Sequence, residues 1–390
     1  MAERRSVRYA HIAGWGMYVP PQVLTNDDLA KMVNTSDEWI TSHTGIRQRH
    51  VVSSTKETTS TLATAAAREA LERSGTDPSD VELIILATLS PDYIFPATAC
   101  LVQDALGADR AGAFDLSAGC SGFIYALAMG SQAIASGAHD TVLIIGAETC
   151  SRLVDWTKRD TCVLFGDGAG AVVLRRSDEP GGVLSTLVRA DGSGSDVLLV
   201  PAGGSRQPAS RDTVDARLHY VHMNGPAVYK FATRIMAKAV REAIERAGLS
   251  INDIDLFIPH QANLRIIESA ARQLGVPLDK FFLNLDRYGN TSAASVPIAL
   301  CEAVEAGQVE AGDHIIMVGF GAGLTWAAAA IQWDGELAPP RPAWERAISP
   351  LRRRARRVRR RIEDMAFGNP ILSRIEAKEP GQAKPEDTDE

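Results

Sequence analysis

The sequence predicts a layered α/β protein built from two halves that repeat one order of elements. Stretches rich in Val, Ile and Leu alternate through Gln332 with Ala/Leu-rich stretches of helical length, which is typical of folds with internal sheets. The order of elements in the first half then recurs in the second. With 390 residues, 45% of them hydrophobic and 23% charged, the chain can bury a large core and has an ordinary globular composition.

The elements of the first half are four buried strands with helices between them. The strands are predicted at 81–89, 113–116, 141–147 and 169–175, and the helices at 61–74 and 120–136. The second half repeats part of this series with a strand at 282–286, a helix at 292–306 and a strand at 314–319. Each half is also expected to place a glycine-rich turn after its second strand, at 166–170 and at 319–323.

These elements and the composition divide the chain into five segments. Residues 1–180 form the first half and residues 181–335 the second, with the join near 177–182, where Asp-Glu-Pro-Gly-Gly interrupts the pattern. The remaining segments are a Pro-rich linker at 336–349, an Arg-rich amphipathic helix at 350–368 and a disordered end at 369–390.

Composition and charge exclude several classes of protein. The apolar runs are of strand length and no signal peptide is visible, so we expect neither a membrane-spanning nor a secreted protein. Five scattered cysteines without a C-x-x-C pair fit a reducing cytoplasm and argue against a disulfide frame or a metal site. The first 340 residues hold 28 basic and 39 acidic residues, so we expect no specific nucleic-acid partner for the body of the protein.

Cys120 is the candidate nucleophile. It stands in Ser117-Ala-Gly-Cys-Ser-Gly, after a predicted strand and at the head of an apolar helix. A helix N-terminus offers free N–H groups and a positive dipole end, which lower the pKa of a thiol. A buried structural cysteine is the alternative, and these residues alone leave both readings open. The other four cysteines lack such a setting and are expected in the core.

His260 and Asn290 are polar residues at two further strand-to-helix junctions. His260 follows the predicted strand at 254–258, and strand ends are where α/β proteins place functional groups. Asn290 holds the place in the second half that Cys120 holds in the first. Taken singly, a structural histidine and a turn asparagine that caps a helix are the simpler readings. Together the three side chains can converge on one site.

The combination resembles the thiolase superfamily, and within it β-ketoacyl-acyl-carrier-protein synthase III. The resemblance covers about residues 9–333, nearly the whole body of the chain. Long motifs in a fixed order carry it: Asn34-Thr-Ser-Asp-Glu-Trp-Ile, Thr44-Gly-Ile-Arg, Phe95-Pro-Ala-Thr-Ala-Cys, Gly119-Cys-Ser-Gly-Phe, Leu164-Phe-Gly-Asp-Gly-Ala-Gly-Ala, Pro259-His-Gln-Ala-Asn-Leu-Arg-Ile-Ile and Gly289-Asn-Thr-Ser-Ala-Ala-Ser-Val-Pro. The implied fold is a duplicated thiolase-like fold, layered α-β-α-β-α with two internal mixed sheets.

The resemblance implies a decarboxylative Claisen condensation that starts fatty-acid synthesis. Cys120 would take the acyl group of an acyl-CoA primer, and malonyl-acyl-carrier protein would then lose CO₂ and attack the acyl-enzyme. His260 and Asn290 would donate hydrogen bonds to the malonyl thioester oxygen. Phe320 would border the reacting carboxylate, and the N–H groups of Cys120 and Ala322 would hold the oxyanion. No cofactor is implied, because coenzyme A enters as part of the substrate.

The resemblance also implies contacts with the substrates and with a second copy of the chain. Trp39 and Arg159 would hold the CoA nucleotide. His43 stands where some members have arginine, and Pro226 where the family has asparagine, so a charge and a hydrogen bond to CoA are missing there. Three basic side chains are expected to bind the carrier protein. In the implied homodimer, one aromatic side chain is expected to close the acyl pocket of the partner. These residues are Lys230, Arg265 and Arg272 for docking, and Phe95 for the pocket.

Two alternatives and one unassigned segment remain open. A specialised-pathway acyltransferase or condensing enzyme would share the fold and the cysteine, and a non-catalytic scaffold would act through the tail. Eight arginines between 352 and 361 surround a narrow apolar stripe in the predicted helix at 350–368. A solvated charged helix and a helix on an anionic membrane surface are the main readings, with the acidic carrier protein or nucleic acid as further ligands.

Overall fold

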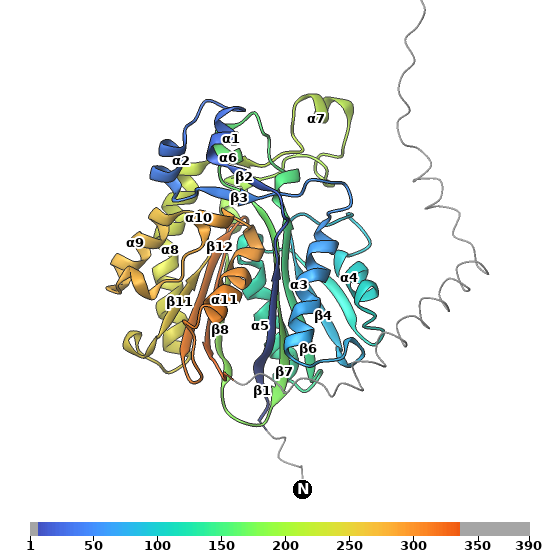
Figure 1. Cartoon of the computed structure of the whole chain (residues 1–390), viewed down its shortest axis with the longest axis vertical. Coiled ribbons are helices and arrows are strands. Elements are labelled where there is room, and N and C mark those ends of the chain that lie inside the picture. The colour runs from blue at the N-terminus through green and yellow to red at the C-terminus, as the bar shows by residue number, and fades with distance from the viewer. Residues whose placement is uncertain (1–6, 336–390) are drawn as a thin grey trace, which may run out of the picture. The chain divides into compact units, whose positions relative to one another are not determined.

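The computed structural model describes residues 7–335, and the predicted linker, Arg-rich helix and disordered end lie outside these residues. Two mixed sheets form its framework (Figure 1). The first has the order β1 (Tyr9–Tyr18), β7 (Asp167–Ser177), β6 (Thr141–Thr149), β4 (Leu83–Ala87) and β5 (Gly112–Leu116). The second has the order β11 (Leu256–Pro259), β12 (His314–Gly321), β13 (Thr325–Gln332) and β8 (Gly182–Ala190). Each sheet contains both parallel and antiparallel neighbours.

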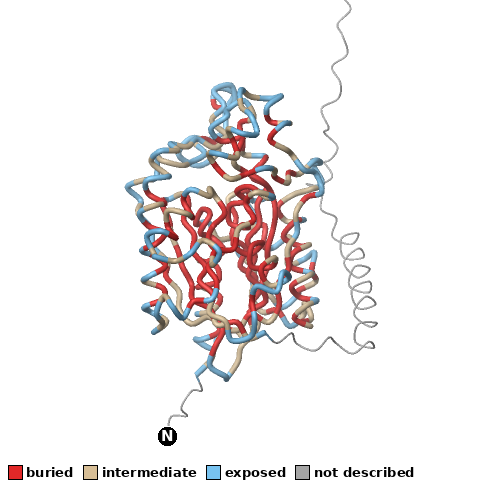
Figure 2. The backbone as a smooth tube through the Cα atoms, turned by 60° about the vertical axis from the view of Figure 1, so that its left-hand side comes forward, coloured by how far each residue is buried: buried red, intermediate tan, exposed pale blue. Residues whose placement is uncertain are grey.

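Helices form three layers around and between the two sheets. On the outer face of the first sheet lie α3 (Thr59–Arg73) and α4 (Thr98–Leu106), and on the outer face of the second lie α8 (Gly225–Arg246) and α9 (Leu264–Leu274). Between the sheets, α5 (Gly122–Ala135) and α11 (Ser295–Glu305) contact strands of both. The predicted α-β-α-β-α layering is confirmed. Figure 2 shows a buried interior, to which β4, β6, β7, β12 and β13 contribute most, whereas β5 at the edge of the first sheet has no buried residue.

The duplication is visible in the strand order. When the strands of each half are numbered along the chain, both sheets read 1-5-4-2-3. In the second half, however, the third place is taken only by an isolated parallel bridge between Phe257 and Phe281. The predicted strand at 282–286 is therefore wrong, because the Gln261 side chain donates to Phe282 O at 3.0 Å and accepts from Asn284 N at 3.2 Å in place of a strand ladder.

The first glycine-rich stretch is also not a turn, because β7 begins at Asp167. Its glycines lie in the strand where α11 crosses at close range. A Cβ on Gly170 would stand 2.7 Å from Pro297 Cβ, and one on Gly168 would stand 2.8 Å from Ile298 Cδ1. The glycines thus allow the central helix to contact the sheet directly.

Short elements make up the remainder of the described chain and surround one end of the sheets. They are β2 (Val23–Thr25), β3 (Gln48–His50), β9 (Leu198–Leu199), β10 (His222–Met223), α1 (Asn26–Ala30), α2 (Asp37–Thr44), α6 (Arg159–Cys162), α7 (Arg211–Asp215) and α10 (Leu285–Tyr288). None of the described helices is long and apolar enough to cross a membrane. All five cysteines are free, and Cys100 is exposed, which corrects the expectation that it lies in the core.

Candidate active site

A cavity of about 810 Å³ receives side chains from both halves of the fold. Cys120, His260 and Asn290 all line it, so the structure brings together the three residues that the sequence singles out. Trp39, His43, Phe320 and Arg265 also face it. Most of its other lining residues are apolar: Val163, Leu164, Phe165, Leu198, Met223, Val228, Tyr229, Phe231, Ala262, Ile266 and Leu324. The cavity can therefore hold an extended, largely apolar ligand against a few polar groups.

Cys120 lies in a tight turn between β5 and α5, and two glycines allow this turn. A Cβ on Gly119, whose φ is +60°, would stand 2.5 Å from Ala322 N. Gly321 approaches the backbone of Cys120 just as closely from β12. The backbone of residues 119–120 thus lies directly against that of residues 321–322, the two segments in which the sequence analysis expects the oxyanion N–H groups.

Burial raises the pKa of the Cys120 thiol to about 12. A hydrogen bond with Ser292 lowers this pKa and the nearby Glu148 carboxylate raises it, but desolvation has the larger effect. The sequence analysis expects a low pKa from the helix N-terminus, whereas burial of Cys120 raises this pKa. The buried Cys120 is therefore mainly a neutral thiol at neutral pH, and its proton has to be removed before or during attack.

His260 is buried at the end of β11 and is a neutral imidazole. Burial lowers its pKa to about 3. Its Nδ1 lies 2.6 Å from Ser295 Oγ at the start of α11, and the Phe320 ring stands edge-on at 5.3 Å between centroids. If the Ser295 hydroxyl donates to Nδ1, the imidazole proton resides on Nε2. In that tautomer His260 is a hydrogen-bond donor toward the cavity.

Asn290 is held by both its backbone and its side-chain oxygen. Its N–H donates to Leu164 O at 2.8 Å, and its carbonyl accepts from Gly166 N at 3.0 Å. The side-chain Oδ1 accepts from Ser292 N at 2.8 Å. Because this oxygen is occupied, the group that Asn290 offers to a ligand is its NH₂. His260 and Asn290 can therefore act as two neutral donors near one buried thiol.

The mouth of the cavity is aromatic and basic. The Trp39 ring has the His43 ring stacked on it at 4.4 Å and the Arg159 guanidinium at 4.4 Å from its centroid. His43 Nδ1 lies 2.7 Å from Trp39 O, which it can reach only as a donor, so its other nitrogen is an acceptor. Pro226 is the second residue of α8, and the side chain of Asn224, which directly precedes the helix, caps it by accepting from Ala227 N.

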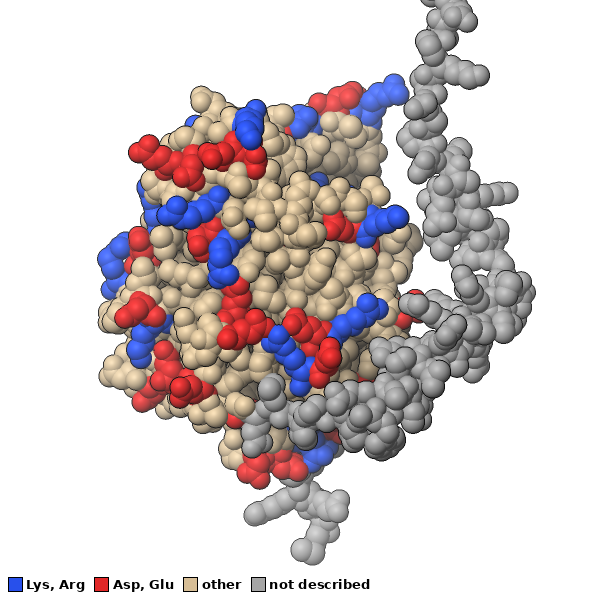
Figure 3. All heavy atoms as spheres, viewed as in Figure 1, with Lys and Arg blue, Asp and Glu red and all other residues tan. Residues whose placement is uncertain are grey.

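Three predicted contact residues are exposed on α8 and α9, and one lies away from the cavity. Lys230, Arg265 and Arg272 are exposed, and Arg265 donates to Ser42 O at 2.8 Å. Phe95 is 84% exposed and does not line the cavity of its own chain. On the face shown in Figure 3, acidic and basic side chains are mixed and form no single basic patch.

Sequence reasoning missed three buried polar residues around the site. Ser292 and Ser295 hold Asn290 and His260, and Glu148 accepts from Ser292 Oγ at 3.0 Å. The serines lie inside the motif that begins at Gly289, so their spacing at a buried helix start was the available signal. Glu148 had no local signal beyond being a charged residue at the end of an apolar strand.

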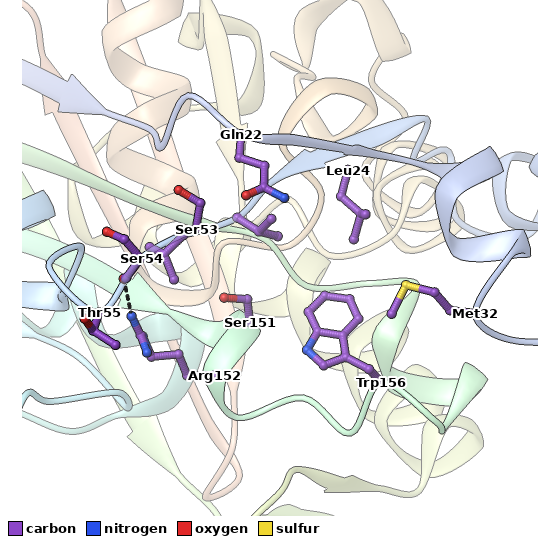
Figure 4. A pocket seen from close by; sticks show the side chains of 11 residues that line it. Gln22, Leu24, Met32, Ser53, Ser54, Thr55, Ser151, Arg152 and Trp156 are labelled. Atoms are coloured by element: carbon purple, nitrogen blue, oxygen red, sulfur yellow. Dashed lines mark hydrogen bonds between the residues drawn. The ribbon is translucent and has the colours of Figure 1, made fainter. Parts of the chain in front are cut away.

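A second hollow of about 490 Å³ contains none of the predicted site residues. Its walls include Gln22, Leu24, Met32 and Trp156 (Figure 4). The Arg152 guanidinium in it donates to Ser54 O at 2.7 Å and to Glu57 O at 3.0 Å, so this cation is already bound by backbone carbonyls. The predicted catalytic residues Cys120, His260 and Asn290 all line the first cavity instead.

Comparisons with known proteins agree with this geometry. The family model for 3-oxoacyl-[acyl-carrier-protein (ACP)] synthase III matches residues 114–192, and the model for its C-terminal part matches residues 244–333. The chain is 54% identical over 327 residues to a β-ketoacyl-[acyl-carrier-protein] synthase III of Symbiobacterium thermophilum, covering 84% of this chain and 99% of that protein. A relative with the same name from Roseiflexus sp. (strain RS-1) is 54% identical over 325 residues, covering 83% and 98%.

Solved structures with a similar fold include members of the same family. A 3-oxoacyl-[acyl-carrier-protein] synthase III from Aquifex aeolicus VF5 matches with a TM-score of 0.77 and 48% identity, covering 83% of this chain and 100% of that one. The priming β-ketosynthase from the R1128 polyketide biosynthetic pathway matches with a TM-score of 0.78 and 36% identity, covering 85% and 98%.

Proposed function

The chain belongs to the 3-oxoacyl-[acyl-carrier-protein] synthase III family, and from this premise we propose that Cys120, His260 and Asn290 carry the two half-reactions of its condensation. Membership makes the protein an acyltransferase-type condensing enzyme that starts fatty-acid synthesis. The observation that supports the proposal is the placement of one buried thiol and two neutral donors in a single apolar cavity.

In the first half-reaction, Cys120 Sγ attacks the thioester carbonyl of an acyl-CoA. The carbonyl oxygen becomes negative, and the N–H groups of Cys120 and Ala322, whose backbone segments lie against each other, would stabilise it. Coenzyme A then leaves as the thiolate, and the acyl group remains on Cys120. The enzyme needs no resident cofactor for this step, since the thioester itself is the activated group.

In the second half-reaction, malonyl-acyl-carrier protein loses CO₂ and becomes an enolate. Negative charge develops on its thioester oxygen, and His260 Nε2–H and Asn290 Nδ2–H stabilise that charge. Both donors are uncharged, which suits an apolar cavity where an unpaired cation would be costly. Phe320 packs against His260 and limits the water that reaches the carbanion. The carbanion attacks the acyl-enzyme and releases the β-ketoacyl product.

Substrate recognition is proposed at the mouth of the cavity and on the two neighbouring helices. Adenine would stack on Trp39 once Arg159 moves aside to pair with phosphate. The exposed residues of α8 include Lys230, Arg234, Lys238 and Arg241, and α9 adds Arg265 and Arg272. This basic surface suits an acidic carrier protein.

The proposed function is tested by following an acyl group through both half-reactions. Incubation with radiolabelled acetyl-CoA should place the label on Cys120, and malonyl-acyl-carrier protein should then remove it as a β-ketoacyl thioester. A comparison of kcat/KM across a panel of acyl-CoA primers would assign the pathway. If the similarity to the R1128 ketosynthase extends to function, a primer of specialised metabolism should have the highest kcat/KM. An absence of label with every primer, from folded protein, would contradict the proposal.

A homodimer is proposed from an exposed apolar loop beside an edge strand. Ile94 and Phe95 are 86% and 84% exposed, and Phe114 lies on β5, which ends the first sheet. Pairing of two copies would cover these side chains and place Phe95 at the partner's acyl pocket. We expect a dimer by sedimentation at micromolar concentration, and Phe95→Ala should shift primer preference to longer chains. Val214→Ala, at an exposed site on α7, is the control, and a monomeric wild type would contradict the proposal.

A membrane contact and a cytoplasmic location remain proposals. The free thiols are compatible with a reducing compartment. The sequence at 350–368 combines clustered arginines with an apolar stripe, which suits an anionic lipid surface. The full chain should therefore co-sediment with phosphatidylglycerol vesicles at low salt, and truncation after Pro340 should abolish this while condensation persists. Equal sedimentation of both proteins would rule out the contact.

A further inference from the structure

Glu148 is a fully buried carboxyl group that lies close to the nucleophile. It stands at the end of β6, next to the turn that carries Thr88, Leu89 and Ser90. Its Oε2 accepts from Leu89 N, Ser90 N, Ser90 Oγ and Thr88 Oγ1 at 2.6–3.1 Å. No basic side chain is among the hydrogen-bond partners of this carboxyl in the described chain. Burying a carboxyl group without a cationic partner costs free energy, which these hydrogen bonds offset only in part.

The other carboxyl oxygen, Oε1, faces the active site. It accepts from Ser292 Oγ at 3.0 Å, and it shares the Leu89 N–H at 3.1 Å. The crowded donors around Oε2 leave little room there for an added proton. A proton taken up by Glu148 therefore goes to Oε1, on the side of Ser292.

Ser292 connects Glu148 to two of the proposed catalytic residues, Cys120 and Asn290. Its hydroxyl donates to Glu148 Oε1 at 3.0 Å and interacts with the Cys120 thiol, and its N–H donates to Asn290 Oδ1 at 2.8 Å. Its φ of +50° is in the left-handed region, which is uncommon for serine and unfavourable for its backbone. The surrounding contacts hold this conformation, and it aims the hydroxyl between the carboxyl and the thiol.

We propose that Glu148, acting through the Ser292 hydroxyl, takes up the proton that Cys120 loses on acylation and returns it when the thiol is released. The proposal rests on the proposed function, since it assigns the path of the proton in that same reaction. His260 cannot serve as this acceptor, because burial makes its imidazole a weak base. Glu148 suits the role because burial raises the pKa of its carboxyl above that of an ordinary glutamate.

The proton balance closes over one turnover. As Cys120 Sγ bonds to the acyl carbon, its proton passes to Ser292 Oγ while the Ser292 proton passes to Glu148 Oε1. Coenzyme A leaves as the thiolate and takes a proton from solvent. In the condensation, the carbon–sulfur bond to Cys120 breaks, and the thiolate recovers its proton from Glu148 through Ser292. Glu148 ends as the carboxylate in which it began, and CO₂ carries away the malonyl carboxylate.

The test compares Glu148→Gln and Ser292→Ala with the wild type in two separate assays. The first is the rate of Cys120 acylation by acetyl-CoA between pH 6 and 10, and the second is the decarboxylation of malonyl-acyl-carrier protein. Glu245→Gln, on the exposed side of α8, is the matched control. Other titratable groups near the pair are Cys150, Asp167 and His260, and all of them are unchanged in these variants.

We expect both variants to acylate about 10²-fold more slowly at pH 7, with the rate rising steeply toward pH 10 as hydroxide replaces the lost acceptor. Decarboxylation should fall far less, because the Ser292 N–H still holds Asn290. Equal or faster acylation by Glu148→Gln would overturn the proposal, since removing a negative charge alone favours the thiolate. Equal losses in both assays would also overturn it, because they would indicate a structural role. Failure of the wild type to acylate at all would instead contradict the proposed function.

Discussion

Cys120→Ser is expected to reduce condensation by at least about 10³-fold. The hydroxyl of serine is a far weaker nucleophile than a thiol, and the site offers no histidine base to activate it, because the His260 imidazole is neutral with a pKa of about 3. The measurement is the appearance of β-ketoacyl-carrier protein, together with mass spectrometry for an acyl group on residue 120.

Cys100→Ser is the matched control for this substitution. It makes the same chemical change at an exposed cysteine of α4, and its activity should equal that of the wild type. The Cys120 variant should keep its donors His260 and Asn290 in place and should still decarboxylate malonyl-carrier protein. A variant at Cys120 that condenses at a rate within tenfold of the wild type would exclude this thiol as the acyl carrier.

His260→Ala and Asn290→Ala should each slow decarboxylation by about 10²–10³-fold while leaving acylation of Cys120 largely intact. Each change removes one donor from the developing enolate oxygen, whereas the oxyanion of the first half-reaction is held by backbone N–H groups. Controls are His222→Ala and Asn252→Ala, both at exposed positions. If either active-site variant decarboxylated at the wild-type rate, that residue would have no part in stabilising the enolate.

The pH dependence gives a further check on His260. Since burial lowers the pKa of His260 from 6.5 to about 3, the imidazole is already neutral at pH 5 and stays so at higher pH. The rate of decarboxylation by the wild type should therefore show no step near pH 6.5 that can be attributed to His260. The pH profile of His260→Ala should have the same shape there at a lower rate. A His260-dependent loss of rate as the pH falls through 6.5 would mean that the side chain titrates there and is less buried during turnover.

The sequence predicts the layers and the three central residues because each is encoded locally. Buried strands appear as apolar runs, and Cys120, His260 and Asn290 each follow such a run within a long motif. The strand expected at 282–286 fails because Gln261, some twenty residues earlier, satisfies that backbone with its side chain. The glycines at 168 and 170 were read as a turn because the helix that crosses them lies far along the chain.

The ionisation of the site could not be predicted from the sequence. The pKa of Cys120 depends on how completely the folded chain covers the thiol, and this burial raises it, whereas a local pattern shows only the helix that follows. Glu148 obtains its partners from residues 88–90 and from Ser292, which are separated from it by tens of residues in both directions. Its proximity to the nucleophile therefore emerges only from the packed structure.

The placement of α5 and α11 between two sheets has a kinetic consequence. Their backbone amides are covered on both sides, so their hydrogens should exchange with solvent only when the whole domain unfolds. The mouth of the cavity is instead bordered by α2, α6, β9 and β10, and the last three are only two to four residues long. Opening of these short elements requires little free energy. The thioester arm of the substrate should thus enter through fast local fluctuations at the mouth of the cavity. The reacting groups deeper in the cavity should keep their positions over many turnovers.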